Sequence, residues 1–292
     1  TGSAYQHFIV APEQYSPSPS YSYSAFGDSF TSGEGETNDE FYENGTNTAA
    51  NHCHVSMRSY PYLVGNALSL PTINKACSGA RTSDVQKVLE SYSKGSTANV
   101  TPLSSSFTTL SVGGNDIGIM DKLKSCLSLG ICEWARQENR HRTAEEIKGL
   151  FPTLVELIQQ TKETMPNTQL TIVGYPSVTS SDANAKCNVI NSTLLDSDER
   201  QYFNETLRYL NTILQAAASY TGTLYINIEN ALFGERLCEA NEQGMNGLRW
   251  GDDIAPIGAL KIIGAESFHP TPWGHARVAQ SIISQLTPSW PD

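Results

Sequence analysis

Short apolar segments alternate with longer amphipathic segments along most of the chain. The short segments have the composition and length of β-strands, and they lie at about residues 20–26, 72–75, 107–112, 169–173 and 223–228. Strands that alternate with helices favour right-handed βαβ units and a parallel sheet. The pattern therefore predicts an α/β fold, a three-layer α/β/α sandwich built on a five-stranded sheet.

The amphipathic segments predict helices, and several carry their own start and stop signals. Thr143-Ala144-Glu145-Glu146 has the pattern of a capping box and predicts the start of a long helix. Pro152 predicts a kink or a break within that helix. Asp196 is expected to cap a further helix that Gly222 ends. The other helices are expected at about 61–68, 83–92 and 273–286.

Neither an internal repeat nor a sharp change in composition divides the chain. We therefore expect a single domain over 1–292 that begins with an irregular lead-in at 1–19. The hydrophobic fraction of 39% and the charged fraction of 17% are those of a soluble globular protein. No apolar run approaches the ~20 residues that a transmembrane helix needs. A net charge of −11 without a Lys/Arg cluster argues against nucleic acid and anionic membranes as partners.

Cysteines and glycosylation sequons point to a secretory history. The six cysteines are an even set without the paired C-x-x-C blocks of a structural zinc site, and they allow fifteen disulfide pairings. Four N-x-S/T sequons, any of which could accept a glycan, lie at Asn44, Asn99, Asn191 and Asn204. The chain begins at Thr1 without a hydrophobic leader, as expected of a mature protein whose signal peptide has been removed. We expect a secreted, disulfide-bonded glycoprotein.

A possible nucleophile lies at the end of the first predicted strand. The sequence Phe26-Gly27-Asp28-Ser29 ends an apolar run and opens a polar one, so Ser29 is expected at a strand's carboxyl end, where α/β sheets bind ligands. Serine after aspartate is also ordinary turn chemistry, and Asp28 is expected to brace the turn through backbone N–H groups. The role of Ser29 therefore depends on which other groups the fold brings to it.

Three further positions supply what a serine hydrolase needs. Ester hydrolysis requires a nucleophile, a base, a group that orients the base, and donors for the developing oxyanion. His269, before the last helix, can act as the base. Gly79 lets a backbone N–H approach a substrate oxygen closely, Asn115 offers a side-chain amide, and Ser29 offers its own N–H.

These residues resemble the successive blocks of the SGNH/GDSL hydrolases. The order and spacing of the blocks match over about residues 20–280. The six cysteines and the longer matching stretches at 76–84 and 113–118 resemble the family's secreted esterase/lipase branch. The matching stretches are Phe26-Gly27-Asp28-Ser29, Ala76-Cys77-Ser78-Gly79-Ala80-Arg81-Thr82-Ser83-Asp84, Gly113-Gly114-Asn115-Asp116-Ile117-Gly118 and His269-Pro270.

The resemblance implies a fold, an activity and residue roles. It implies a flavodoxin-like sheet of strand order 2-1-3-4-5 and three disulfides, which we expect to be Cys53–Cys77, Cys126–Cys132 and Cys187–Cys238. It assigns Ser29 as nucleophile and oxyanion donor, Gly79 and Asn115 as oxyanion donors, and His269 as general base. No metal or organic cofactor is required.

The family's usual Asp-x-x-His block is Glu266-Ser267-Phe268-His269 here. The orienting group has one task, which is to accept the Nδ1–H of His269 and stabilise the imidazolium. The Glu266 carboxylate can do this, and so can a backbone carbonyl of residue 266 or 267. We favour the Glu266 position and leave the choice between carboxylate and carbonyl open.

Two polar features of the sequence suggest a metal at first sight. His52 and His54 flank Cys53, but a disulfide is the better use of that cysteine. The acidic segment 34–40 lacks the regular ligand spacing of a calcium loop and is expected to be a solvated rim.

The sequence thus favours a secreted, monomeric serine esterase or lipase of the SGNH (GDSL) type, with a lipid, phospholipid or small acyl ester as substrate. Within enzymes, the alternative is a carbohydrate esterase that removes acetyl or feruloyl groups from polysaccharide. A non-enzymatic sugar- or lipid-binding module on the same fold is the rival from another class, although such a module would be expected to have lost part of the Ser29, Gly79, Asn115 and His269 set.

Overall fold

The computed structural model describes most of the chain. The described residues are 22–93, 106–120, 122–123, 132–182, 184–185, 196–239, 241–249 and 264–286. The lead-in expected at 1–19 lies outside them.

A five-stranded parallel sheet forms the centre of the fold. Its strands are β1 (Tyr23–Gly27), β2 (Thr72–Asn74), β3 (Phe107–Ser111), β4 (Gln169–Val173) and β5 (Leu224–Ile226). Their order is β2-β1-β3-β4-β5 and each neighbouring pair is parallel, which confirms the predicted topology. Every residue of β1 and β3 is buried, as expected of central strands covered on both faces.

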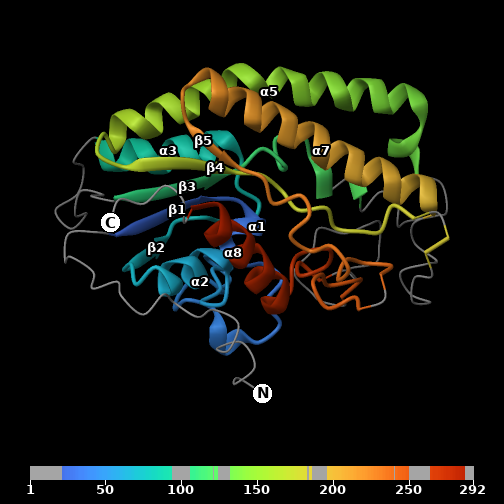
Figure 1. Cartoon of the computed structure of the whole chain (residues 1–292), viewed down its shortest axis with the longest axis horizontal. Coiled ribbons are helices and arrows are strands. Elements are labelled where there is room, and N and C mark those ends of the chain that lie inside the picture. Colours follow the sequence, from blue (N-terminus) through green and yellow to red (C-terminus); the bar gives the residue numbers. More distant parts are fainter. Residues whose placement is uncertain are drawn as a thin grey trace.

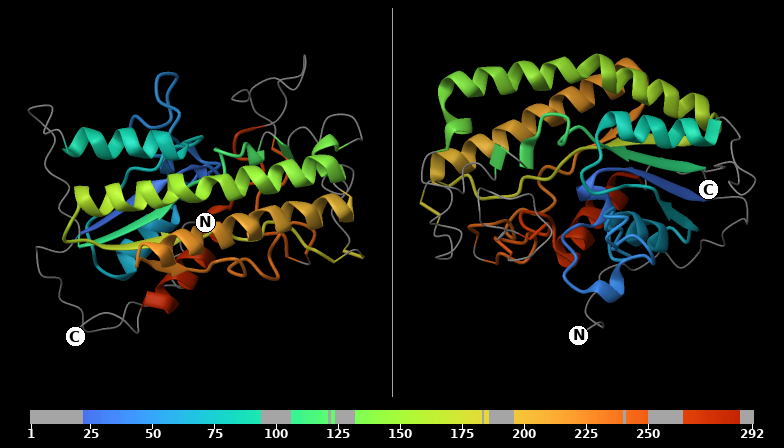
Figure 2. Two further views of the ribbon diagram at one scale, coloured as in Figure 1. Left: turned by 90° about the horizontal axis from the view of Figure 1, so that it is seen from above. Right: turned by 180° about the vertical axis from the view of Figure 1, so that it is seen from behind.

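Helices cover both faces of this sheet. The helices are α1 (Ser29–Ser32), α2 (Tyr60–Ala67), α3 (Thr82–Ser93), α5 (Gln137–Thr164), α7 (Ser197–Tyr220) and α8 (Pro272–Leu286), with 3-10 turns η1 (Asp39–Phe41) and η2 (Glu133–Ala135). Figure 1 shows α3, α5 and α7 on one face and α2 with α8 on the other, and the two further views in Figure 2 agree. The result is the three-layer α/β/α sandwich that the alternation of elements predicts.

The longest helix differs from its prediction. Helix α5 begins at Gln137, before the expected start, and Thr143 lies inside it, where its hydroxyl accepts a hydrogen bond from the Trp134 indole at 3.2 Å. The helix also continues through Pro152 without a break, and in Figure 1 it bows over the sheet. Pro152 lies on the exposed side, where water can satisfy the carbonyl that its missing N–H leaves unpaired.

Helix α7 follows its prediction closely. The Asp196 carboxylate accepts the Glu199 N–H, and the Glu199 side chain accepts the Asp196 N–H in return, which is a complete capping box. Gly222 follows the helix in the left-handed conformation, with φ of 59°.

The parallel strands bring the carboxyl end of β1 against that of β3. Gly27 lies in register with Ser111, and a Cβ at Gly27 would come within 2.4 Å of the Ser111 carbonyl oxygen. Only glycine permits this approach of the two backbones. The segments that follow β1 and β3, which carry Ser29 and Asn115, therefore emerge side by side at one edge of the sheet.

Candidate active site

Ser29 begins a short helix directly after β1. Asp28 caps this helix α1, because its Oδ1 accepts the Phe30 N–H at 3.0 Å. The Ser29 carbonyl is held from the other side by the N–H groups of Gly33 and Glu34, at 3.1 and 3.2 Å. These backbone contacts fix Ser29 in a tight turn in which its side chain is only 5% exposed.

His269 reaches Ser29 from the segment that precedes α8. Its Nε2 lies 2.8 Å from Ser29 Oγ, and its Nδ1 lies 3.1 Å from the carbonyl oxygen of Ser267. A carbonyl oxygen can only accept, so Nδ1 carries the hydrogen and Nε2 presents its lone pair to the Ser29 hydroxyl. This is the tautomer that a general base facing a serine needs.

The Nδ1 acceptor is thus a main-chain carbonyl one residue after Glu266. The sequence favoured Glu266 and left carboxylate and carbonyl open; the geometry favours the carbonyl alternative and places it at Ser267. Glu266 contributes its own carbonyl to the turn, where that oxygen accepts the His269 N–H at 3.3 Å. Phe268, between them, has φ of 62°, so the turn that aims the Ser267 carbonyl at the ring uses an unfavourable backbone conformation.

Gly79 and Asn115 lie on two segments that are joined to each other. The Asn115 amide donates to the Ala80 carbonyl at 3.0 Å, and the Asp116 carboxylate accepts from the N–H and hydroxyl of Thr82 at 3.0 and 2.6 Å. Gly79 has φ of 77°, in the region that favours glycine, and no atom lies within 4 Å of the place where a Cβ would stand. Backbone conformation rather than crowding therefore requires glycine there.

The backbone N–H groups of Ser29 and Gly79 have no acceptor in the part of the chain that the structure describes. The Gly79 segment is held by a disulfide between Cys53 and Cys77 and by the Ser78 N–H, which donates to the Cys53 carbonyl at 3.0 Å. The pairing of Cys53 with Cys77 is the one expected from the sequence.

Behind Ser29, Asp28 and Tyr175 form a buried polar contact that the sequence did not reveal. The Tyr175 hydroxyl donates to Asp28 Oδ2 at 2.5 Å and accepts the Gly114 N–H at 3.1 Å. Burial raises the pKa of Asp28 to about 7, an effect that its hydrogen bonds from Tyr175 and Phe30 only partly offset. Both oxygens of Asp28 hold the framework of the site, in agreement with its expected role as a brace.

Asp28→Asn is expected to change how stability depends on pH. A carboxyl whose pKa is raised by folding keeps its proton where the unfolded chain has released it, so its stabilising contribution is complete below about pH 4 and is lost as the pH rises to about 7. The asparagine variant is neutral throughout. The Tm difference, variant minus wild type, should therefore rise between pH 4 and 7 in thermal unfolding, on top of a constant loss from altered hydrogen bonds. A difference that is flat over this range would contradict the raised pKa.

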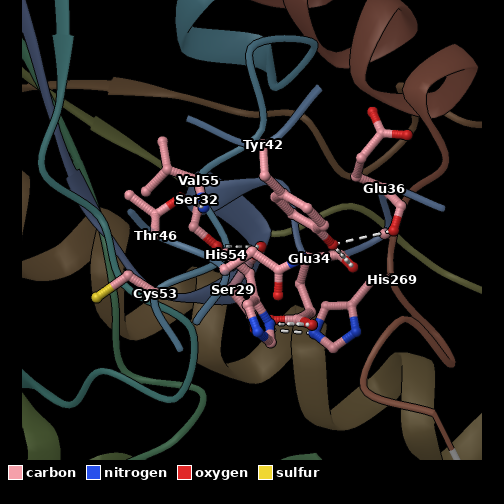
Figure 3. Close-up of polar contacts among 12 residues, drawn as sticks. Ser29, Ser32, Glu34, Glu36, Tyr42, Thr46, Cys53, His54, Val55 and His269 are labelled. Atoms are coloured by element: carbon pink, nitrogen blue, oxygen red, sulfur yellow. Dashed lines mark hydrogen bonds and ion pairs between the residues drawn. The ribbon is translucent and has the colours of Figure 1, made fainter. Parts of the chain in front are cut away.

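The sequence predicted that the acidic segment 34–40 is a solvated rim, but the structure differs at two of its positions. Glu34 and Glu36 are each about 1% exposed. Figure 3 shows the His54 ring facing the Glu34 carboxylate beside Ser29 and His269, with His54 Nδ1 2.7 Å from both carboxylate oxygens. Glu36 binds Arg58 through both oxygens, at 2.5 and 2.8 Å. Each buried carboxylate thus has a basic partner, 20 and 22 residues further along the chain, which a count of acidic residues cannot show.

The structure bears on one of the four sequons. Asn204 is buried in α7, where its amide donates to the Thr179 carbonyl at 2.7 Å and its oxygen accepts the Val178 N–H at 3.3 Å. A glycan on Asn204 would have to break both contacts, which argues against this sequon; its use stays a prediction. Asn44 is exposed and remains a candidate, whereas Asn99 and Asn191 lie outside the described residues.

The other two predicted disulfides stay predictions. Cys132 and Cys238 are both disulfide-bonded, but Cys126 and Cys187 lie outside the described residues. No group of His, Cys, Asp and Glu side chains suited to a metal ion occurs among the described residues. In the same part of the chain, no helix is both long and apolar enough to cross a bilayer.

Comparison with known proteins identifies relatives along almost the whole chain. The model of the GDSL-like Lipase/Acylhydrolase family matches residues 25–277. Lipase 2 of Streptomyces coelicolor is 23% identical over 95% of this chain and 89% of its own length. A lipase of Streptomyces rimosus is 24% identical, over 91% of this chain and 86% of its own length.

Solved structures with this fold include two Streptomyces enzymes. Phospholipase A1 from Streptomyces albidoflavus NA297 superposes with a TM-score of 0.71 at 25% identity, over 91% of this chain and 99% of that one. The extracellular lipase of Streptomyces rimosus gives a TM-score of 0.67 at 22% identity, over 90% and 99%.

Proposed function

The chain belongs to the GDSL-like lipase/acylhydrolase family, and from that premise we propose that it hydrolyses carboxylic esters through an acyl-enzyme on Ser29. The observation that carries this assignment is the contact of 2.8 Å between His269 Nε2 and Ser29 Oγ, with Nδ1 of the same ring held by a main-chain carbonyl. Nucleophile and base within hydrogen-bond reach, with the base oriented by a third group, is the arrangement that activates a serine.

In the first half of the reaction, the Ser29 hydroxyl gives its proton to His269 Nε2 as Oγ forms a bond to the acyl carbon. The substrate's carbonyl oxygen takes up negative charge. The N–H groups of Ser29 and Gly79 can donate to this oxygen. The Asn115 side-chain amide supplies a third donor: one of its two N–H groups binds the Ala80 carbonyl, and the other is left for the substrate oxygen. One such donor is typically worth ~3 kcal/mol of activation barrier.

The intermediate then collapses, and the His269 proton passes to the leaving alkoxide as the bond between it and the acyl carbon breaks. Water attacks the acyl-enzyme in the second half, giving one proton to His269 Nε2, which returns it to Ser29 Oγ as the acid leaves. In both halves the imidazolium is stabilised through its Nδ1–H by the Ser267 carbonyl. That carbonyl is a dipole rather than a full charge, so orientation of the ring is its main contribution.

An apolar acyl group suits the surroundings of Ser29. A small hollow of about 10 Å³, room for about one water, lies against Ser29 and Asn115. It does not itself hold an acyl chain, but the side chains around it are largely apolar, among them Ile119, Met120, Phe203 and Leu207. The named relatives are lipases and a phospholipase A1. Both facts support a lipid or other acyl ester as substrate over a polysaccharide ester. The disulfides support secretion, and so does the extracellular lipase among the structural relatives.

A fluorophosphonate probe tests the proposal directly, because it forms a stable adduct with an activated serine. We expect one adduct per chain, mapped to Ser29 by mass spectrometry, and loss of activity in step with labelling. A parallel panel would compare p-nitrophenyl esters from acetate to palmitate, a phospholipid and acetylated xylan. Absence of an adduct from the folded protein would overturn the serine mechanism, and preferential hydrolysis of the xylan would overturn the lipid assignment.

A further inference from the structure

Asn246 lies at the junction between the segment that carries His269 and the segment that follows Ser29. It is about 1% exposed, far from both residues in sequence, and belongs to no helix or strand. Its backbone and side chain each contact a different one of these two segments.

The backbone of Asn246 pairs with the His269 segment. Its N–H donates to the His269 carbonyl at 2.9 Å, and its carbonyl accepts the Phe268 N–H at 3.1 Å. An antiparallel bridge between Met245 and Pro270 extends this pairing. Phe268, whose φ of 62° is unfavourable for a residue with a side chain, is therefore held in place by a bond to Asn246.

The side chain of Asn246 binds the other segment. Its Nδ2 donates to the Gly35 carbonyl at 2.8 Å, while its Oδ1 accepts from Arg249 Nε and Nη2 at 3.1 and 3.0 Å. A guanidinium group can only donate, so Arg249 fixes which end of the amide is the acceptor and turns the donor toward Gly35.

Gly35 is close to the catalytic pair from both directions. A Cβ at Gly35 would lie 1.8 Å from the Pro270 carbonyl oxygen, so the two segments meet backbone to backbone. Glu34, its neighbour, donates its N–H to the Ser29 carbonyl at 3.2 Å. Ser29 is thus connected to His269 by a hydrogen bond to Glu34, the peptide bond from Glu34 to Gly35, and hydrogen bonds from Asn246 to Gly35 and to His269.

From these contacts we propose that Asn246 is a positioning residue that sets the distance between His269 and Ser29. The inference rests on the proposed function, because it assumes that these two side chains do the chemistry. Proton transfer from Ser29 to His269 needs a short, aligned contact, and a displacement of the order of 1 Å can reduce turnover about 10²-fold. The hydrogen bond from the Asn246 side-chain amide to the Gly35 carbonyl opposes such a displacement. Loss of this hydrogen bond should therefore affect turnover rather than substrate binding.

The test replaces the donor without changing the size of the side chain. Asn246→Asp keeps an oxygen for Arg249 but sets a carboxylate oxygen against the Gly35 carbonyl, so the two segments repel each other. Asn204→Asp is the matched control, because Asn204 is a similarly buried asparagine on α7 whose side chain contacts the backbone of Val178 and Thr179, outside this set. Both variants should lose some Tm.

The readout is turnover per active site on p-nitrophenyl butyrate, with sites counted by fluorophosphonate labelling. We expect Asn246→Asp to lower kcat per labelled site at least tenfold with KM within about twofold. Asn204→Asp should leave kcat per labelled site within twofold, because destabilisation alone reduces the number of sites and not the rate at each one. An unchanged kcat in folded Asn246→Asp would overturn the proposal.

Two further measurements keep the test decisive. If Asn246→Asp does not fold, Arg249→Met replaces it in the test, because the Arg249 side chain orients the Asn246 amide and is itself exposed. Arg249→Met should lower kcat two- to fivefold at constant KM. An unchanged kcat in Arg249→Met would again overturn the proposal. Ser29→Ala separates the two hypotheses. Activity that survives in Ser29→Ala refutes the proposed function, whereas an inactive Ser29→Ala together with a fully active Asn246→Asp refutes the role of Asn246 alone.

Discussion

Ser29→Ala is expected to lower kcat for a p-nitrophenyl ester by about 10⁴-fold or more, as removal of the nucleophile does in serine hydrolases whose triad members act as a unit. The substitution removes Oγ, whose contact in the site is with His269 Nε2. It leaves the backbone contacts of Ser29, since the carbonyl that accepts from Gly33 and Glu34 is unchanged. Activity should therefore fall while the fold persists.

Ser32→Ala is the matched control for that experiment. Ser32 lies in the same short helix, is fully buried, and donates its hydroxyl to the Ser29 carbonyl at 3.3 Å. Its loss removes one buried hydroxyl at the same place without touching the proposed chemistry, so kcat should stay within a few-fold of wild type. Circular dichroism and Tm would check the fold of both variants. Retention of more than about 1% of wild-type kcat by Ser29→Ala would rule out Ser29 as the nucleophile, given the losses seen in such enzymes.

The sheet and its order could be predicted because local pattern and topology agreed. Five strands separated by helices leave few arrangements once crossovers are right-handed, and the strand order came with the family resemblance. Helix α7 was predicted well because strong local signals mark both of its ends, Asp196 at the start and Gly222 after the last turn. The start of α5 was missed because Thr143 and the glutamates after it imitate a capping box inside a helix. There Thr143 bonds to Trp134, a tertiary contact that the pattern cannot contain.

The site was predictable where the chemistry resides in a side chain, and not where it resides in the backbone. Ser29 and His269 stand out because few residue types can serve as nucleophile or base. The Ser267 carbonyl does not, since every residue has a carbonyl, and its aim depends on the turn at Phe268. Asn246 likewise has no motif, because its position near Gly35 arises only when distant segments pack together.

A comparison of His269→Gln with Glu266→Gln would decide which group orients the base. His269→Gln is expected to lower kcat by about 10⁴-fold or more, since it removes the ring nitrogen that contacts the Ser29 hydroxyl. Glu266→Gln should retain kcat within about threefold, because the Nδ1–H is accepted by a main-chain carbonyl that the substitution leaves in place. The two values would be measured on p-nitrophenyl butyrate with active sites counted by labelling.

The two candidates for the orienting group predict effects of very different size. An orienting carboxylate replaced by its amide costs about 10⁴ in kcat in serine proteases, because the amide holds the imidazole in the wrong tautomer. A loss of that order in folded Glu266→Gln would mean that the carboxylate is required and that the Ser267 carbonyl is insufficient. The Glu266 charge still acts nearby, because burial and then the charges of Glu34 and Glu266 raise the pKa of Tyr42. A small change in Glu266→Gln is therefore compatible with the carbonyl. A loss of 10⁴ is not, because a carbonyl in the main chain holds the same tautomer whichever side chain residue 266 carries.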